Sequence, residues 1–313
     1  MDSSPETTCA PALVQGGEYA SIAEWISANP EWVDLLYING SILFRGFDVL
    51  DPAAFDTTLD SLLEPVAEFS EETSPRSSIG ARAFTSTDYP RRYPIQFHHE
   101  FSYRKNYPDR VAFCCLTPAA SGGATPLADS RKVLRRLRTG VVERFEKLGI
   151  AYVRNFSGLG VSWEKSFGTT DKARISEYCR AHDIEHSWTG DDLRTRQTAP
   201  AVITHPVTAE RAWFNSVLNL NVAGTEPESV REAMRSLPAG SLPTNTTYGS
   251  GDPIEPDVLE QVRQAYAQEA IRFRWHKGDV LLIDNVLTAH ARDPFEGNRS
   301  IIVGMGSAIT RPG

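Results

Sequence analysis

The chain has 313 residues, of which 41% are hydrophobic and 23% charged, and these values are ordinary for a globular protein with a sizeable core. Its net charge of −8 and its isoelectric point near 5.5 argue against nucleic acid and anionic membrane surfaces as partners, since both attract basic proteins. No apolar stretch reaches the ~18 residues that a membrane span needs. The first residues show neither the basic region nor the apolar region of a signal peptide, so we expect none, and the four cysteines lack metal-binding spacing. We therefore expect a soluble, cytoplasmic protein.

Helical periodicity begins after a stretch, residues 1–18, whose composition predicts loose order. Ile22, Trp25 and Ile26 recur at i, i+3 and i+4, and Asn29-Pro30 stops this pattern. The same kind of spacing, with capping residues at several ends, predicts further helices over residues 55–63, 130–149, 171–182 and 255–269.

Short apolar or alternating runs bounded by Gly, Pro and Asn are typical of strands, and they occupy residues 42–47, 111–116, 151–156, 201–205, 212–217, 279–284 and 300–305. These runs do not alternate regularly with the predicted helices. The pattern favours a mainly β protein, a sandwich or jelly roll with covering helices, over a doubly wound sheet. All-β domains of this length are common, so we expect residues 19–313 to form a single domain.

One segment inside this domain, residues 218–253, is rich in Asn, Thr, Ser, Gly and Pro and has few apolar residues. So long a polar insertion in a compact domain is often a functional lid, although an inert surface loop has the same composition. We interpret it as a lid insertion.

The segment IQFHHEFSY (95–103) places two histidines beside a glutamate. In an extended chain His98 and Glu100 point to one face and His99 points away from it. His290 follows a strongly apolar strand and is the best candidate for a third ligand, because His205 and His276 resemble structural or surface residues. Two imidazoles and one carboxylate form a facial triad, which leaves coordination positions on Fe(II) open for a co-substrate and dioxygen.

Arg299 lies nine residues after His290, at the start of the last apolar strand. A guanidinium beside the metal can pair bidentately with the distal carboxylate of a 2-oxoacid. Arg292 is a rival, but it lies only two residues past His290. Thr125, in the glycine-rich GGATPLADSR (122–131), offers a hydroxyl to the same carboxylate.

Several of these motifs, FHHEFSY, PAASGGATPLADSR and DNVLTAHARDPFEGNRSIIVGMG, resemble the taurine dioxygenase and clavaminate synthase superfamily of Fe(II)/2-oxoglutarate-dependent oxygenases. Within it, they look most like amino-acid hydroxylases of antibiotic and non-ribosomal peptide pathways, such as the syringomycin aspartyl hydroxylase type. The resemblance covers roughly residues 40–306. It implies a double-stranded β-helix in which His98, Glu100 and His290 bind Fe(II), and in which Arg299 and Thr125 bind 2-oxoglutarate.

We therefore expect a dioxygenase that hydroxylates an unactivated C–H bond of an amino acid, or of an amino-acid-derived substrate that is free or bound to a carrier protein. Asn215 is a candidate for substrate contact, and bonding to the backbone is its alternative role. The same iron centre could also perform desaturation or oxidative cyclisation. A cupin-like metal-binding protein without 2-oxoglutarate is the alternative from another class. The chain differs from common relatives at His99, where they have Asn, and at 218–221, where they have an aromatic–His pair, so substrate identity does not transfer.

Overall fold

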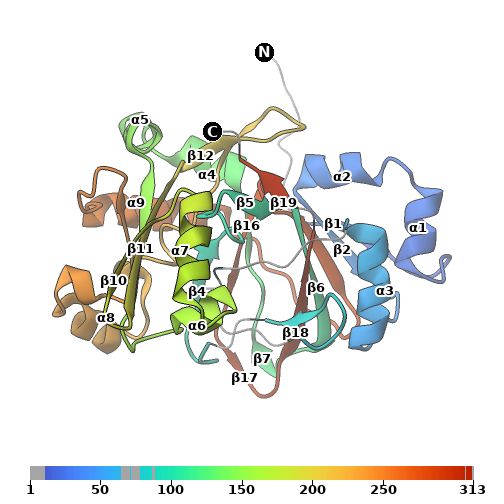
Figure 1. Ribbon diagram of the computed structural model, residues 1–313. Coiled ribbons are helices and arrows are strands. Elements are labelled where there is room, and N and C mark those ends of the chain that lie inside the picture. The colour runs from blue at the N-terminus through green and yellow to red at the C-terminus, as the bar shows by residue number, and fades with distance from the viewer. Residues whose placement is uncertain (1–10, 65–70, 72–77, 87–88, 307, 312–313) are drawn as a thin grey trace, which may run out of the picture.

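The chain mixes helices with largely antiparallel strands, and the strands pack as sheets in the middle of the molecule (Figure 1). The structure is a computed structural model that describes residues 11–64, 71, 78–86, 89–306 and 308–311. Its α-helices are α1 (Ile22–Ala28), α2 (Trp32–Asn39), α3 (Pro52–Leu62), α4 (Ser130–Arg136), α5 (Thr139–Leu148), α6 (Trp163–Phe167), α7 (Lys172–Ala181), α8 (Glu228–Arg235) and α9 (Pro256–Glu269). Short 3₁₀ helices are η1 (Val222–Gly224) and η2 (Ala239–Ser241).

The largest sheet has the strand order β1-β2-β15-β6-β18-β3. Its strands are β1 (Ala12–Gln15), β2 (Ser41–Arg45), β3 (Phe84–Thr85), β6 (Arg110–Thr117), β15 (Val280–Asp284) and β18 (Ser300–Met305). All neighbours pair antiparallel except β1 and β2, which are parallel. Strands distant in sequence are thus neighbours in space.

Smaller sheets complete the β-structure. A three-stranded sheet has the order β4-β16-β8, and a four-stranded sheet has the order β10-β11-β9-β14, beside the pairs β12-β13, β17-β7 and β19-β5. These strands are β4 (Ile95–His98), β5 (Asn106–Pro108), β7 (Ser121–Gly122), β8 (Leu127–Asp129), β9 (Ile150–Phe156), β10 (Glu185–Thr189), β11 (Asp192–Ala199), β12 (Val202–Thr204), β13 (Arg211–Trp213), β14 (Thr244–Tyr248), β16 (Thr288–Arg292), β17 (Phe295–Glu296) and β19 (Ala308–Thr310).

Strand β15, in the middle of the six-stranded sheet, is buried on both faces, and this explains its run of apolar residues from Val280 to Ile283. Leu281 and Ile283 belong to a core shared with the three-stranded sheet, whereas Val280 and Leu282 belong to a second core beneath α1–α3. Successive side chains of a strand point to opposite faces, so burial of both faces favours apolar residues at consecutive positions.

Helix α3 covers the outer face of this sheet. Asp51 caps the helix by accepting a hydrogen bond from the backbone N–H of Ala54, and Pro52 occupies the first turn. Phe55 and Leu59 lie on one helical face, are fully buried and join the second core. Figure 1 accordingly shows α1, α2 and α3 together on one side of the strands.

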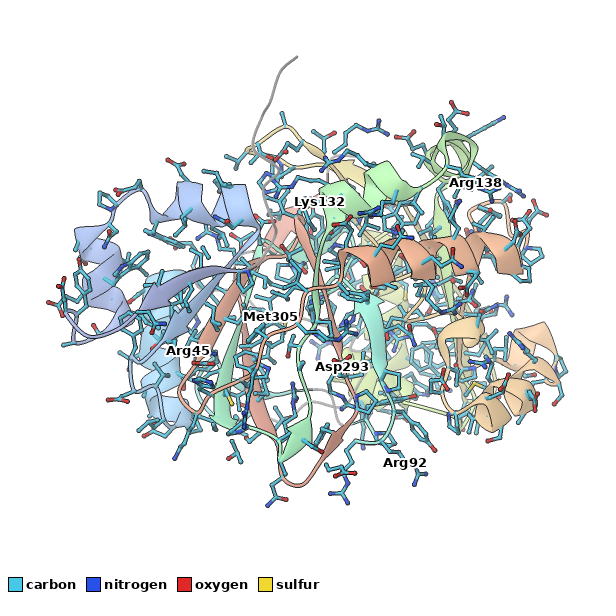
Figure 2. All side chains as sticks on the ribbon, turned by 180° about the vertical axis from the view of Figure 1, so that it is seen from behind. Arg45, Arg92, Lys132, Arg138, Asp293 and Met305 are labelled. Atoms are coloured by element: carbon cyan, nitrogen blue, oxygen red, sulfur yellow. The ribbon has the colours of Figure 1, made fainter. Side chains whose placement is uncertain are left out.

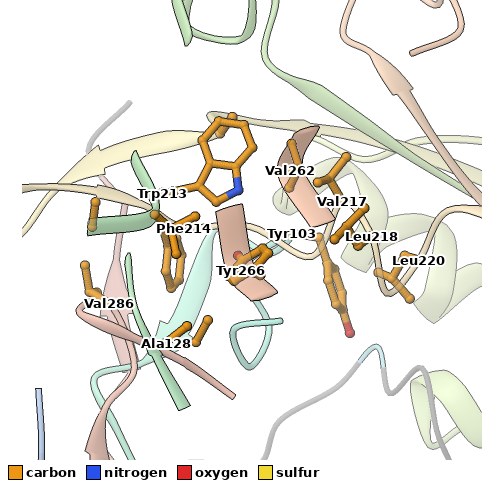
Figure 3. Packing of buried hydrophobic residues seen from close by; sticks show 14 of the residues in the cluster. Tyr103, Ala128, Trp213, Phe214, Val217, Leu218, Leu220, Val262, Tyr266 and Val286 are labelled. Atoms are coloured by element: carbon orange, nitrogen blue, oxygen red, sulfur yellow. The ribbon is translucent and has the colours of Figure 1, made fainter. Parts of the chain in front are cut away.

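Helix α9 covers the opposite side and packs against α4. Figure 2 shows both helices from behind, with Lys132 of α4 labelled. Val262 and Tyr266 of α9 pack in the first core with Trp213 and Phe214, as Figure 3 shows. This core therefore joins the C-terminal helix to the strands that frame the site.

The predicted strands and helices are present, with two differences in their bounds. The predicted helix 130–149 is divided into α4 and α5, and the predicted strand 212–217 ends at Trp213. The description as mainly β is too narrow, because the chain is a mixed α/β protein. Part of the segment predicted to be loosely ordered is a strand: Ala12–Gln15 forms β1 and pairs with β2, while residues 1–10 lie outside the described residues. The polar segment 218–253 contains η1, α8, η2 and β14. Among the residues that the structure describes, no helix is long and apolar enough to span a membrane.

Candidate metal centre and co-substrate pocket

The ligands predicted for the metal meet where β4 and β16 pair. His98 ends β4 and lies directly opposite His290 of β16 in the antiparallel register. Opposed residues on neighbouring strands project to the same face, and the two imidazole ring centroids are 4.3 Å apart. Glu100 follows two residues after His98, in the turn that ends the strand.

The donor atoms of these three residues converge. Glu100 Oε1 lies 3.8 Å from His98 Nε2 and 3.5 Å from His290 Nε2, and one ligand atom from each residue falls within 4.8 Å of the others. His98 Nδ1 lies 2.9 Å from the carbonyl oxygen of Gln96, which can only accept, so Nδ1 carries the proton. The lone pair of His98 is therefore on Nε2, the nitrogen that faces Glu100. The set fits a divalent metal ion.

Glu100 is held by a residue that sequence reasoning missed. Asn285 is fully buried, and its Oδ1 accepts a hydrogen bond from the backbone N–H of Glu100 at 2.9 Å. Its Nδ2 donates to the carbonyl oxygens of Glu100 and Pro108 at 3.0 and 2.9 Å. The only signal in the sequence is a carboxamide directly after a strongly apolar strand, five residues before His290.

The neighbouring Asp284 is also buried, and it accepts the backbone N–H groups of Val286 and Leu287 through Oδ1. Its other oxygen lies 3.0 Å from His205 Nε2. His205 is thus a structural residue, as predicted, although it is buried and not on the surface. His276, the other rejected histidine, is exposed.

His99 points away from the metal ligands, as the strand geometry predicts. Its ring nitrogens lie 3.0 Å from the carbonyl oxygen of Asn215 and 2.7 Å from the hydroxyl of Ser130. Burial lowers the pKa of His99 to about 3, so the ring is neutral. The side chain of Asn215 itself bonds to backbone, donating to Ala201 O and accepting from Val217 N. The Asn215 side chain therefore joins the backbone segments around Ala201 and Val217, and it does not line either of the two cavities beside the candidate ligands.

Arg299 and Thr125 lie together in a pocket beside the metal ligands. Arg299 donates to Gly123 O at 2.9 Å through Nε, and to Thr125 Oγ1 at 3.2 Å through one terminal nitrogen. Trp275 Nε1 also donates to Thr125 Oγ1, which leaves the hydroxyl proton available for an acceptor. Burial, together with the nearby positive charge of Arg292, lowers the pKa of Arg299 to about 10, so the guanidinium is charged at neutral pH.

Arg292 lines the same pocket, but its guanidinium donates to the carbonyl oxygens of Tyr89, Pro90 and Tyr93. These hydrogen bonds hold residues 89–93, which precede β4, in place. This geometry leaves Arg299 as the better carboxylate partner, because its second terminal nitrogen makes no hydrogen bond to the described residues.

Two cavities meet at the candidate metal ligands, since His98 and Glu100 belong to the walls of both. The smaller, of about 470 Å³ with its open mouth, is lined by Arg299 and Thr125 and by apolar residues such as Phe113 and Ile301. The larger has a volume of about 1100 Å³. A molecule in either cavity can approach the metal position.

Comparison with known proteins agrees with this arrangement. A family model described as taurine catabolism dioxygenase TauD, TfdA family, matches residues 5–305. The chain belongs to the TauD/TfdA family. This TauD/TfdA protein is an enzyme, an oxygenase that depends on Fe(II) and 2-oxoglutarate and acts on a small molecule.

Its relatives include the dapdiamide synthesis protein DdaC of Enterobacter agglomerans, which is 33% identical over 289 residues, or 91% of this chain and 87% of DdaC. A clavaminate synthase-like protein of Arabidopsis thaliana is 28% identical over 293 residues, covering 90% of this chain and 86% of the relative.

Among solved structures, PvcB of Pseudomonas aeruginosa has a TM-score of 0.54 at 16% identity, over 96% of this chain and 88% of PvcB. PvcB is described as an Fe, alpha-ketoglutarate dependent oxygenase from an isonitrile synthetic pathway. This likeness concerns the fold, and it confirms the double-stranded β-helix.

Proposed function

We propose that this TauD/TfdA oxygenase hydroxylates an unactivated C–H bond of an amino acid or amino-acid-derived substrate in specialised metabolism. In this proposal His98, Glu100 and His290 bind Fe(II), and Arg299 and Thr125 bind the distal carboxylate of 2-oxoglutarate. The observation that carries it is the convergence of the three donor groups within 4.8 Å, next to a pocket with a half-buried, charged guanidinium.

In this proposal the protein positions the metal ligands and 2-oxoglutarate. The His98 tautomer presents Nε2 to the metal, and Asn285 fixes the backbone that carries Glu100. Arg299 and the Thr125 hydroxyl would hold the distal carboxylate of 2-oxoglutarate in the pocket that the three candidate ligands also line. When bound, Fe(II) supplies the dioxygen chemistry that couples 2-oxoglutarate decarboxylation to substrate oxidation.

Hydroxylation is favoured over halogenation by Glu100. With Fe(II) bound, the Glu100 carboxylate would take the coordination position that a halide needs, and its negative charge would repel chloride. Desaturation and oxidative cyclisation use the same ligands, and the product mass separates them: hydroxylation adds one oxygen, whereas either alternative removes two hydrogens. The presence of Arg299 in the pocket beside the candidate ligands and the family membership count against a cupin-like protein without 2-oxoglutarate.

The assignment to specialised metabolism is supported by the relative DdaC, a dapdiamide synthesis protein. Both free and carrier-bound substrates are compatible with the larger cavity, which is open to solvent. The experiment is a screen of free and carrier-bound amino acids. Each is mixed anaerobically with the protein, Fe(II) and 2-oxoglutarate, dioxygen is then admitted, and succinate release and the mass of the substrate are measured. His290→Ala should abolish turnover while the fold survives, and retained wild-type activity in that variant would refute the ligand assignment.

A further inference from the structure

The larger cavity beside the metal ligands has a wall whose chemistry points to a class of substrate. Its aromatic side includes Tyr103, which lies next to Leu220 in Figure 3, and both residues line the cavity. Segment 218–253 supplies much of the rest, including Asn219, Thr225 and Met234. The beginning of this segment, at Asn219 and Leu220, therefore forms part of the cavity wall.

Two carboxamides on this wall, those of Gln96 and Asn219, make no hydrogen bond to any residue that the structure describes. Gln96 precedes His98 by two residues on β4, and only its backbone oxygen is used, by the His98 ring. The hydroxyls on the same wall are instead already bonded to protein atoms, as in Tyr89 to Glu226 O, Thr244 to Leu220 O and Ser216 to His99 O.

Gly224 brings the turn that follows Asn219 close against Gln96. A Cβ at Gly224 would lie 2.0 Å from the carbonyl oxygen of Leu218 and 3.3 Å from Gln96 Cγ. Asn221 fixes this turn, since its side chain accepts from Ala223 N and donates to Thr246. Backbone packing thus holds the wall around the Gln96 side chain in place.

The charges around the cavity give it little affinity for an ionic group. Among its described lining residues the only carboxylate is that of Glu100, which belongs to the metal ligands, and there is no Lys or Arg. Arg104 lies behind the aromatic wall, 4.8 Å from the Phe101 ring centroid, and forms an ion pair with Glu71 at 3.5 Å. A charged substrate group on this wall would lose hydration without gaining a counter-ion from these residues.

We propose that Gln96 and Asn219 recognise an uncharged amide of the substrate, either a side-chain carboxamide or an amide linkage. An amide offers a donor and an acceptor, and a protein carboxamide complements both, whereas a carboxylate only accepts and an ammonium only donates. The proposal rests on the proposed function, because it places the amide in the cavity that shares His98 and Glu100 with the co-substrate pocket.

The test uses small probes, so it does not need the natural substrate. The protein is loaded with Zn(II), which does not turn over, and with 2-oxoglutarate, and saturation-transfer NMR measures the binding of four fragments. These are butyramide, the secondary amide N-ethylacetamide, butyrate and butylammonium. One or both amides should bind, and the tighter of the two identifies a carboxamide or an amide linkage. Both ions should bind at least about tenfold more weakly.

Gln96→Leu and Asn219→Leu should each weaken amide binding about fivefold, as expected for one neutral hydrogen bond. Gln96→Glu, which keeps the size of the side chain, should shift preference towards butylammonium. The matched control is Gln264→Leu, because Gln264 is an exposed carboxamide on α9 and does not line the cavity.

Equal binding of amides and ions, absence of amide binding, or amide binding that survives the double substitution of Gln96 and Asn219 would overturn the inference. The signal of 2-oxoglutarate in the same sample separates the two proposals. If 2-oxoglutarate fails to bind, the proposed function fails with it. If 2-oxoglutarate binds and the amides do not, only the amide inference is wrong.

Discussion

At the scale of single residues, the site depends as much on the groups that hold Glu100 as on the metal ligands themselves. Asn285 uses its whole carboxamide on backbone groups of Glu100 and Pro108, with no exposure to solvent. Such a residue fixes the direction from which the carboxylate approaches the metal. Residues that orient ligands in this way commonly change metal affinity by about 10–100-fold when they are replaced.

Replacing Asn285 with Ala should therefore weaken metal binding at least about tenfold. The variant should also lose roughly 3 kcal/mol of stability, because three buried backbone groups lose their partners. Calorimetric titration with Mn(II) and urea unfolding measure the two effects. Asn39→Ala is the control, since the Asn39 amide bonds only to Leu35 O within its own helix. Unchanged Mn(II) affinity in Asn285→Ala would show that Glu100 is positioned without it.

Arg299→Ala should raise the Michaelis constant for 2-oxoglutarate roughly ten- to hundredfold, the range expected for loss of a charged hydrogen-bonded contact worth about 1.5–3 kcal/mol. Arg299→Lys should rescue this loss only in part, because an ammonium lacks the planar fork. Arg272→Ala is a surface control, as Arg272 pairs with Asp293 outside the pocket. A Michaelis constant that does not change in Arg299→Ala would make Arg292 the anchor.

The lowered pKa of Arg299 predicts that the affinity for 2-oxoglutarate depends on pH. Arg299 carries its charge below about pH 10 and loses it as the pH rises through that value. Affinity of the free protein for 2-oxoglutarate should therefore be constant from pH 7 to 9 and fall above 10. The wild type should show this fall in a binding titration, and Arg299→Ala should not.

The sequence was sufficient to select three residues that the fold brings together, because the spacing of His98 and Glu100 follows from strand geometry and His290 follows an apolar strand. It was not sufficient to find Asn285, whose partner Glu100 lies 185 residues away in the chain. It also placed Asn215 as a candidate for substrate contact, whereas the buried side chain bonds to the backbone of Ala201 and Val217. A polar residue's partners depend on long-range packing, which no local pattern records.

At the scale of elements, the predictions succeeded where one face of an element is buried. Phe55 and Leu59 give α3 a clear helical period, and β15 is apolar from Val280 to Ile283 because both of its faces are buried. The polar segment 218–253 was harder, because α8 has no buried residue and therefore no apolar period to detect. Strand β14 within it is rich in Thr and is stabilised by pairing with β9.

These differences predict that only part of segment 218–253 is mobile. Hydrogen exchange should be fast in α8, which packs few apolar groups, and slow in β14, whose backbone is bonded to β9. If the segment acts as a lid, hydrogen exchange over residues 219–235 should be slower when Zn(II), 2-oxoglutarate and an amide are bound than in the free protein. Exchange rates that do not change with any ligand would favour an inert surface segment. Slow exchange in α8 of the free protein would contradict the predicted mobility of this helix.

At the scale of the whole molecule, the double-stranded β-helix brings the ends of the sequence together. Strand β18, near the C-terminus, pairs with β6, and β15 pairs with β2 from the N-terminal quarter of the chain. The parallel pairing of β1 with β2 could not be predicted, because four residues of modest apolar character carry no information about their partner. The same long-range topology places His98 opposite His290, so metal binding is coupled to the integrity of the fold.

This coupling makes the last prediction one of global stability. A metal that binds only the folded protein stabilises it by about 2.7 kcal/mol at a hundred times its dissociation constant. For a domain of this size that corresponds to a rise in melting temperature of roughly 5 °C, which a chelator should reverse. The rise should vanish in His290→Ala and persist in His276→Ala, since His276 is exposed and outside the ligand set. 2-Oxoglutarate should raise the melting temperature further. This second rise should require Arg299, because Arg299 lies in the adjoining pocket and is the proposed partner of the distal carboxylate of 2-oxoglutarate. A metal-dependent rise of equal size in His290→Ala would mean that the metal binds elsewhere, and the proposed centre would be wrong.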